Sequence, residues 1–217
     1  MGKVSQWAAV PLDRLHTMGT PAGLRERKKE ATRQALHEAA MRLSVERGLD
    51  NVTVEAIADA AGVSRRTFSN YFAGKEDALL YGDERRMNRL LEAFTARPPG
   101  EPSWTALHRA AHSVYEEIGE PDPQWVAQSR LARKHPSVLE RQLTHYAGYE
   151  RRLAELIRDR DDLPPGSRRP RVLAGAFLTA MRIAAQVWTE EEPTSPLLAV
   201  LDETVEEMAR PFTEPPD

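Results

Sequence analysis

Apolar residues recur every three or four positions along most of the chain, in segments of helical length. One such stripe runs through Leu139, Leu143, Tyr146, Tyr149 and Leu153, and this spacing places the five side chains on one face of a helix. No alternating run of β-branched residues, of the kind that forms a strand, persists in the sequence. The pattern therefore predicts an all-α fold.

Prolines indicate where the predicted helices end, because proline lacks the backbone N–H that a helix interior uses. None occurs between Pro21 and Pro98, whereas clusters interrupt the remainder of the chain. About nine helices are predicted: Leu24–Arg47, Val54–Ala60, Arg65–Tyr71, Lys75–Ala96, Ser103–Ile118, Gln124–Lys134, Ser137–Arg160, Arg171–Glu190 and Pro196–Ala209. Residues 1–23 and 213–217 are predicted to be disordered tails.

The segment after the first long helix predicts two short helices joined by a tight turn. Thr53 can cap the first helix, Gly62 stands where it must stop, and Ser64 can cap the second. Phe68 and Phe72 are four residues apart and share an inward face. The other faces of the second helix carry polar and cationic residues, namely Arg65, Arg66, Thr67, Ser69, Asn70 and Tyr71. This arrangement is typical of a helix-turn-helix whose second helix reads base edges in the DNA major groove.

Charge is distributed unevenly, and the imbalance favours the same interpretation. Residues 1–75 contain 12 Lys and Arg against 8 Asp and Glu, whereas residues 76–217 contain 18 against 25. A basic front half suggests a polyanionic partner. A generic helical hairpin is the alternative, but the glycine corner, the paired arginines after a cap and the basic start of the preceding helix together favour double-stranded DNA.

From about Lys28 to Ala78, roughly a quarter of the chain, the sequence resembles the DNA-binding domain of the TetR family of bacterial transcriptional regulators. The matching residues keep their order and spacing, and they are Ala39-Ala40, Leu43, Gly48, Thr53, Ile57-Ala58, Ala60 to Ser64, Thr67-Phe68, Tyr71-Phe72 and Lys75-Glu76. There is one departure at Ser69, where many members carry tyrosine. A phosphate contact often made there is therefore absent or is supplied by Tyr71.

The resemblance implies a three-helix DNA-binding domain over residues 24–75 and a helical ligand-binding and dimerisation domain over residues 76–212. It also implies that Lys75 touches a DNA phosphate and that the protein is a homodimer. If the resemblance holds, the small residues of the helix predicted over Arg171–Glu190 suggest that a helix of a second subunit packs closely against it. The predicted dimer interface consists of Ala176, Ala180, Leu197, Leu201 and Val205. The alternative is that these residues only complete the core of one subunit.

A ligand pocket is expected among the helices that follow the DNA-binding domain. Its candidate large side chains are Phe94, Trp104, Tyr115, Trp125, Tyr146, Tyr149, Phe177 and Met181, and its candidate polar side chains are His112, Arg130 and Arg182. A buried arginine is costly unless it is paired, so Arg182 suggests an anionic ligand; the alternative is that the arginines pair with acids such as Glu116 or Glu117. Residues 133–152 are weakly similar to regulators with an acyl-CoA-like ligand-binding domain.

Several function classes are disfavoured by composition. The chain has no cysteine, which fits a reducing cytoplasm and removes disulfides and cysteine zinc sites. No apolar run approaches the roughly 20 residues of a membrane span, and no signal-peptide core or phosphate-binding loop is evident. His108 and His112 have the spacing of two metal ligands, but no glutamate stands between them to act as a base. We therefore expect no metal, no cofactor and no membrane partner.

These observations predict a ligand-responsive DNA-binding transcriptional regulator in the cytoplasm. The expected form is a homodimeric repressor that binds an inverted-repeat operator and that a small-molecule inducer releases. The alternatives are a transcriptional activator, or a helical enzyme or adaptor that uses a cavity in the C-terminal domain.

Overall fold

The computed structural model describes residues 21–120, 126–127, 130–131, 134–190 and 195–210. Within them the chain forms eight α-helices, one short 3-10 helix and no strand, which confirms the all-α prediction. The elements are α2 (Pro21–Arg47), η1 (Leu49–Asn51), α3 (Val54–Ala60), α4 (Arg65–Ser69), α5 (Lys75–Thr95), α6 (Ser103–Ile118), α8 (Pro136–Arg160), α9 (Arg169–Glu190) and α10 (Leu197–Ala209). The tails predicted over residues 1–20 and 213–217 lie outside the described residues, as does much of the predicted helix over Gln124–Lys134.

Element boundaries shift by a few residues from those predicted. Helix α2 begins at Pro21, so residues 21–23 are helical and do not belong to a tail. Helix α4 ends at Ser69 because Asn70 already serves as its C-cap, which leaves Tyr71 in a turn.

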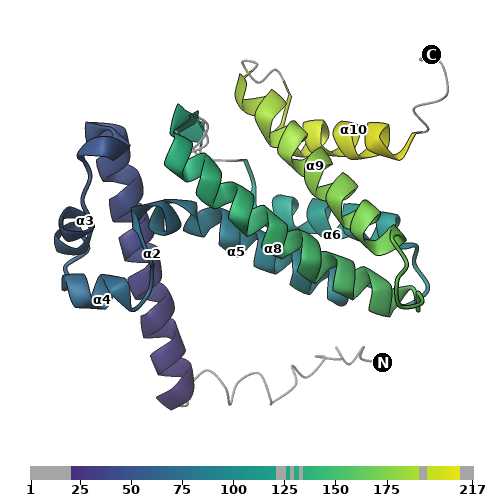
Figure 1. The fold of residues 1–217 in the computed structure, drawn as a ribbon, viewed down its shortest axis with the longest axis horizontal. Coiled ribbons are helices and arrows are strands. Elements are labelled where there is room, and N and C mark those ends of the chain that lie inside the picture. The colour runs from purple at the N-terminus through teal and green to yellow at the C-terminus, as the bar shows by residue number, and fades with distance from the viewer. Residues whose placement is uncertain (1–20, 121–125, 128–129, 132–133, 191–194, 211–217) are drawn as a thin grey trace, which may run out of the picture.

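Helices α2, α3 and α4 form a small unit at one end of the molecule, which we call the head (Figure 1). Its core contains the fully buried Leu36, Ile57 and Phe68. Phe72 completes the inward aromatic pair, with ring centroids 5.8 Å apart from those of Phe68. The aromatic spacing read from the sequence therefore fixes α4 against α2 and α3.

The remaining helices form a larger bundle, which we call the effector domain. Helix α5 leads out of the head and lies beneath α8 in Figure 1, and α9 packs against both α8 and α10. Its core joins Phe94, Leu107, Leu153, Phe177 and Leu201 from five different helices. Each long helix therefore contributes one apolar face to a single core.

Helix α9 is apolar enough, and long enough, to meet the composition of a membrane span, with a mean hydropathy of 1.3 over Arg169–Thr189. In the bundle its side chains Ala174, Phe177 and Ala184 are completely buried against neighbouring helices. This packing accounts for its apolar inner face. Only 39% of its most apolar stretch is buried, however, so part of its outward face is apolar as well.

Candidate DNA-binding surface and effector site

The turn between α3 and α4 is built by caps at both of its ends. The Thr53 hydroxyl accepts a hydrogen bond of 3.1 Å from the Ala56 amide at the start of α3. At the end of α3, Gly62 adopts φ 70°, a left-handed conformation that glycine takes with little strain. The Ser64 hydroxyl then accepts a hydrogen bond of 3.0 Å from the Thr67 amide. Thr53 and Ser64 therefore act as the N-caps predicted from the sequence, and Gly62 follows Ala61, the C-cap of α3.

Most polar candidates of α4 remain exposed, because Phe68 takes the buried position of this short helix. The exposed set is Ser64, Arg65, Arg66, Ser69 and Asn70, with Thr67 and Tyr71 half-buried. The Arg65 guanidinium lies 3.1 Å from the Glu55 carboxylate of α3. The Arg33 guanidinium of α2 lies 5.9 Å from the centre of the Tyr71 ring. The first turn of α4 thus presents two exposed arginines, one of which is paired with Glu55.

Lys75 has a structural role that the sequence did not reveal. Its ammonium donates to the carbonyl oxygens of Leu49, at 2.8 Å, and of Val52, at 3.0 Å. These bonds attach the loop before α3 to the first residue of α5. An ammonium has three N–H donors, so any phosphate contact would share the group with these two carbonyls.

A polar network joins the head to the start of α8. His135 Nε2 lies 2.9 Å from the Asp50 carboxylate of η1, and this hydrogen bond lowers the pKa of Asp50. The Ser137 hydroxyl donates to Glu76 at 3.0 Å. Arg141 donates to Asp77 at 2.8 Å, and His145 Nε2 lies 3.3 Å from the same carboxylate. Helix α8 therefore contacts both η1 and the first turn of α5.

A second junction joins α2 to α5. The Tyr81 hydroxyl donates to Glu30 at 2.6 Å, and burial, together with this carboxylate, raises the pKa of Tyr81 to about 12. Arg85 donates to Gln34 at 2.7 Å and lies 3.3 Å from Glu30. The His37 ring donates through Nδ1 to the Ala78 carbonyl at 2.8 Å, since a carbonyl can only accept. Two separate polar junctions thus hold the head against the effector domain.

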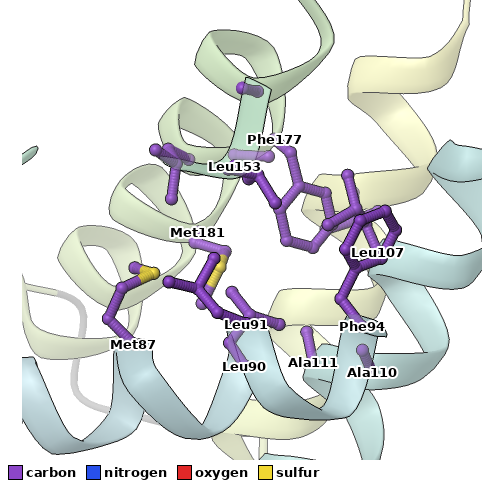
Figure 2. Close-up of a cluster of buried hydrophobic side chains, with 14 of the residues drawn as sticks. Met87, Leu90, Leu91, Phe94, Leu107, Ala110, Ala111, Leu153, Phe177 and Met181 are labelled. Atoms are coloured by element: carbon purple, nitrogen blue, oxygen red, sulfur yellow. The ribbon is translucent and has the colours of Figure 1, made fainter. Parts of the chain in front are cut away.

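Several of the predicted pocket residues belong to the apolar core of the effector domain. Figure 2 shows Phe94 of α5 and Met181 and Phe177 of α9 directed toward one another, with Leu107 and Leu153 beside them. Trp104 packs edge-on against Phe177, with ring centroids 5.7 Å apart. Trp125 lies outside the described residues. These side chains pack against one another in the core of the domain.

Three tyrosines stand at the border of this core. Tyr115 of α6 and Tyr146 and Tyr149 of α8 are half-buried against it. Burial raises the pKa of all three hydroxyls; the Asp83 carboxylate of α5 adds to the shift, whereas Arg86 opposes it at Tyr115 and Tyr146. Within the described residues none of these hydroxyls is hydrogen-bonded, so they can bind a polar group from outside the chain. Asp83 and Arg86 were missed in the sequence because they sit in a mostly charged stretch of α5.

The three polar residues predicted to face a pocket lie outside the apolar core of the effector domain, although Arg182 lines a groove at its surface. Arg182 is exposed and donates to Gln186 at 3.4 Å beside a surface groove of about 270 Å³ between α8 and α9. Arg130 is exposed and donates to the Thr189 carbonyl at 3.5 Å. His112 is 43% exposed, with Asp202 at 3.7 Å. The prediction of a buried arginine was wrong because helical spacing does not specify which face of α9 its neighbours cover.

The predicted dimer interface also requires correction. Ala180, Leu197, Leu201 and Val205 are each at most 3% exposed within the single chain, so they complete the core of one subunit. Ala176 alone of the five is partly exposed. Four of the five candidates therefore follow the alternative interpretation stated from the sequence.

The histidine pair of α6 has a structural partner. His108 Nε2 lies 2.7 Å from the Asp202 carboxylate of α10, and His112 approaches the same residue. In the described part of the chain, no group of three or more His, Asp or Glu side chains could hold a metal ion. The pair therefore links α6 to α10.

Comparison with known families and proteins agrees with this architecture. Residues 36–81 match the family model described as bacterial regulatory proteins, tetR family, and residues 101–213 match the MftR C-terminal domain. The regulator TcmR of Streptomyces glaucescens is 32% identical over 79% of this chain and 80% of its own length. MftR of Mycobacterium tuberculosis is 24% identical over 78% of this chain and 85% of its own.

Solved structures share the fold. SmeT, the repressor of a multidrug efflux pump of Stenotrophomonas maltophilia, is 19% identical in its complex with triclosan. That structure covers 86% of this chain and 98% of its own, with a TM-score of 0.56. At this identity the similarity establishes the fold alone, and the looser likeness to an acyl-CoA-like domain stays a prediction.

Proposed function

The chain belongs to the TetR family of bacterial transcriptional regulators, and from this premise we propose that it is a homodimeric repressor of an inverted-repeat operator, released by a small molecule. As a member of a family of regulators it is a DNA-binding protein and not an enzyme. The observation that carries the proposal is the first turn of α4. There Arg65 and Arg66 follow the Ser64 cap and remain exposed.

The chemistry of α4 suits readout of a major groove. Arginine can donate two parallel hydrogen bonds to guanine, and serine or asparagine can bind either kind of base edge. Arg66, Ser69 and Asn70 are exposed, and among the described residues no hydrogen bond or ion pair engages their side chains. Thr53 and Ser64 use their hydroxyls as caps, so their part in DNA binding is to position the helix.

Dimerisation is proposed through the outward face of α9. Val172 is 66% exposed and Leu143, across the α8–α9 groove, is 61% exposed, which makes them the most exposed large apolar side chains of the described residues. Ala176 and Thr179 lie one and two turns beyond Val172 and are half-buried. Small side chains of this kind let a second copy approach closely. A second copy is the occupant that a two-fold operator requires.

The effector is proposed to bind among α5, α6, α8 and α9. The apolar core residues of these helices suit a ligand with an apolar body, and the hydroxyls of Tyr115, Tyr146 and Tyr149 suit a hydrogen-bonding group on it. SmeT, which shares the fold, has been solved with triclosan. Because Tyr146 and Tyr149 lie on the helix that contacts Asp50 and Asp77 through its first turns, a ligand that shifts α8 would shift the head.

The experiment is DNase footprinting of the purified protein on the DNA flanking its own gene. We expect protection of two half-sites about one helical turn, or a multiple of it, apart. The matched variants are Arg66→Ala and Arg158→Ala, the latter at the far end of α8 beside Asp159. Loss of the footprint in the first variant only supports the proposal. Protection that is equally strong on unrelated DNA contradicts operator-specific repression.

A further inference from the structure

A hollow lies where the head meets the effector domain, away from the α4 surface, and one of its lining residues, Arg86, also acts on Tyr115 and Tyr146 of the tyrosine cluster. Its volume is about 300 Å³, at the lower end of the range for small-molecule sites. Its walls come from three helices: Gln34 and His37 of α2, Gly82, Arg85, Arg86 and Arg89 of α5, and Ile118 at the end of α6. A molecule bound there would touch the head and the effector domain together.

The wall of this hollow is lined by basic side chains. Three arginines and a histidine face it, and no carboxylate is among its lining residues. Each of the three arginines has a carboxylate partner outside the lining: Asp83 pairs with Arg86, Glu30 is 3.3 Å from Arg85, and Glu117 is 3.5 Å from Arg89. Glu117 is 70% exposed, so its hold on Arg89 is weakened by solvent. A guanidinium carries five N–H donors, so such pairs leave capacity for an anion.

The floor of the hollow is shaped by a close approach of two helices. A Cβ atom on Gly82 would lie 3.2 Å from His37 Nε2, which is tighter than ordinary contact. His37 uses Nδ1 to bind the Ala78 carbonyl, so Nε2 is the atom left on the side of Gly82. Burial lowers the pKa of His37; an anion in the hollow would act in the opposite direction and favour the protonated, donating imidazole.

We propose that this hollow binds a small anion with a carboxylate or phosphate group, and that it is a second effector site separate from the apolar one. Arginine forks match the planar carboxylate and the phosphate tetrahedron. Ile118, 40% exposed at the mouth, offers an apolar edge to the rest of the ligand. Because α2 supplies one wall and α5 with α6 the others, the bound anion fixes the angle between the head and the effector domain.

The test is isothermal titration calorimetry of the full chain with two probes, sodium pyrophosphate and sodium citrate, against sodium chloride at matched ionic strength. The two probes distinguish a phosphate ligand from a carboxylate ligand. We expect saturable binding of at least one of them. Arg89→Gln should weaken that binding about tenfold, which corresponds to roughly 1.4 kcal/mol and is the size of one charge-assisted contact.

Arg158→Gln is the matched control, since Arg158 is an exposed arginine of α8 whose partner among the described residues is its neighbour Asp159. It should leave the dissociation constant within about twofold of wild type. Absence of saturable heat with both probes would overturn the proposal. So would binding that Arg89→Gln and Arg158→Gln change equally. DNA is not present in the experiment, so the outcome is independent of whether the protein represses an operator.

Discussion

The head and the effector domain use their candidate residues in opposite ways. In the head the fold rests on Phe68 and its apolar neighbours, and the polar residues of α4 stay exposed. In the effector domain the predicted interface residues Ala180 and Leu201 are buried in the core of the single subunit. In a short capped helix, the sequence shows which side chains cap the helix, which are buried and which are exposed. In a long amphipathic helix, the sequence shows which side chains share a face, but it does not show whether the same subunit or a second copy covers that face. The predictions below test this contrast.

The largest effect is expected from placing a charge on each face of α9. Ala180 is fully buried and Ala176 is partly exposed. Ala180→Glu buries an unpaired carboxylate and should lower the free energy of unfolding by about 4 kcal/mol or more. Ala176→Glu should cost the subunit less than about 1 kcal/mol but should prevent dimerisation. Urea titration and analytical ultracentrifugation measure the two effects.

The same pair of variants can contradict the assignment of the faces. If Ala176→Glu remains dimeric, the second copy does not cover this part of α9. If Ala180→Glu unfolds at the wild-type urea concentration, Ala180 does not lie in the core of the subunit.

A smaller effect is expected from Lys75→Met, which tests whether Lys75 serves the fold of the head. Removal of the ammonium leaves the Leu49 and Val52 carbonyls without their donor, at a cost of about 2 kcal/mol in unfolding free energy. Affinity should fall alike for operator and random DNA, because a phosphate contact carries no sequence information. Fluorescence anisotropy with both DNAs checks this, and a loss confined to the operator would assign Lys75 to base readout.

The two arginines of α4 should differ in their contribution. Arg66→Ala should weaken operator binding by about 1–3 kcal/mol and relax discrimination at one base position per half-site. Arg65→Ala should cost less, because Arg65 must exchange its ion pair with Glu55 for the DNA contact. Anisotropy titrations with single-base operator variants measure both. Equal losses on random DNA would show that these arginines only bind phosphates.

The head could be predicted almost residue by residue because its signals are local. Thr53, Gly62 and Ser64 are all within a few residues of the groups they satisfy. The hydrogen bonds of the two junctions could not be predicted, because their partners are far apart in the sequence. His135 is bonded to Asp50, and Tyr81 is bonded to Glu30. Arg182 also depends on contacts between distant segments. Its apolar neighbours in the sequence suggested that it is buried, but the packing of α8 against α9 leaves it exposed.

The last expected effect is confined to high pH and concerns Tyr81, the phenol that joins the head to the effector domain. Its pKa is raised to about 12 by burial and by Glu30, whereas an unfolded tyrosine titrates near 10. The folded state therefore keeps a proton that the unfolded state releases, and the resulting stability is complete below pH 10 and is lost as the pH rises toward 12. Between pH 10 and 12 the free energy of unfolding falls by at most about 1.4 kcal/mol per pH unit because of this group. Tyr81→Phe should make the free energy of unfolding fall less steeply between pH 10 and 12, as measured by urea titration across that range. A Tyr81→Phe curve parallel to that of wild type would mean that the junction does not hold this phenol in its neutral form.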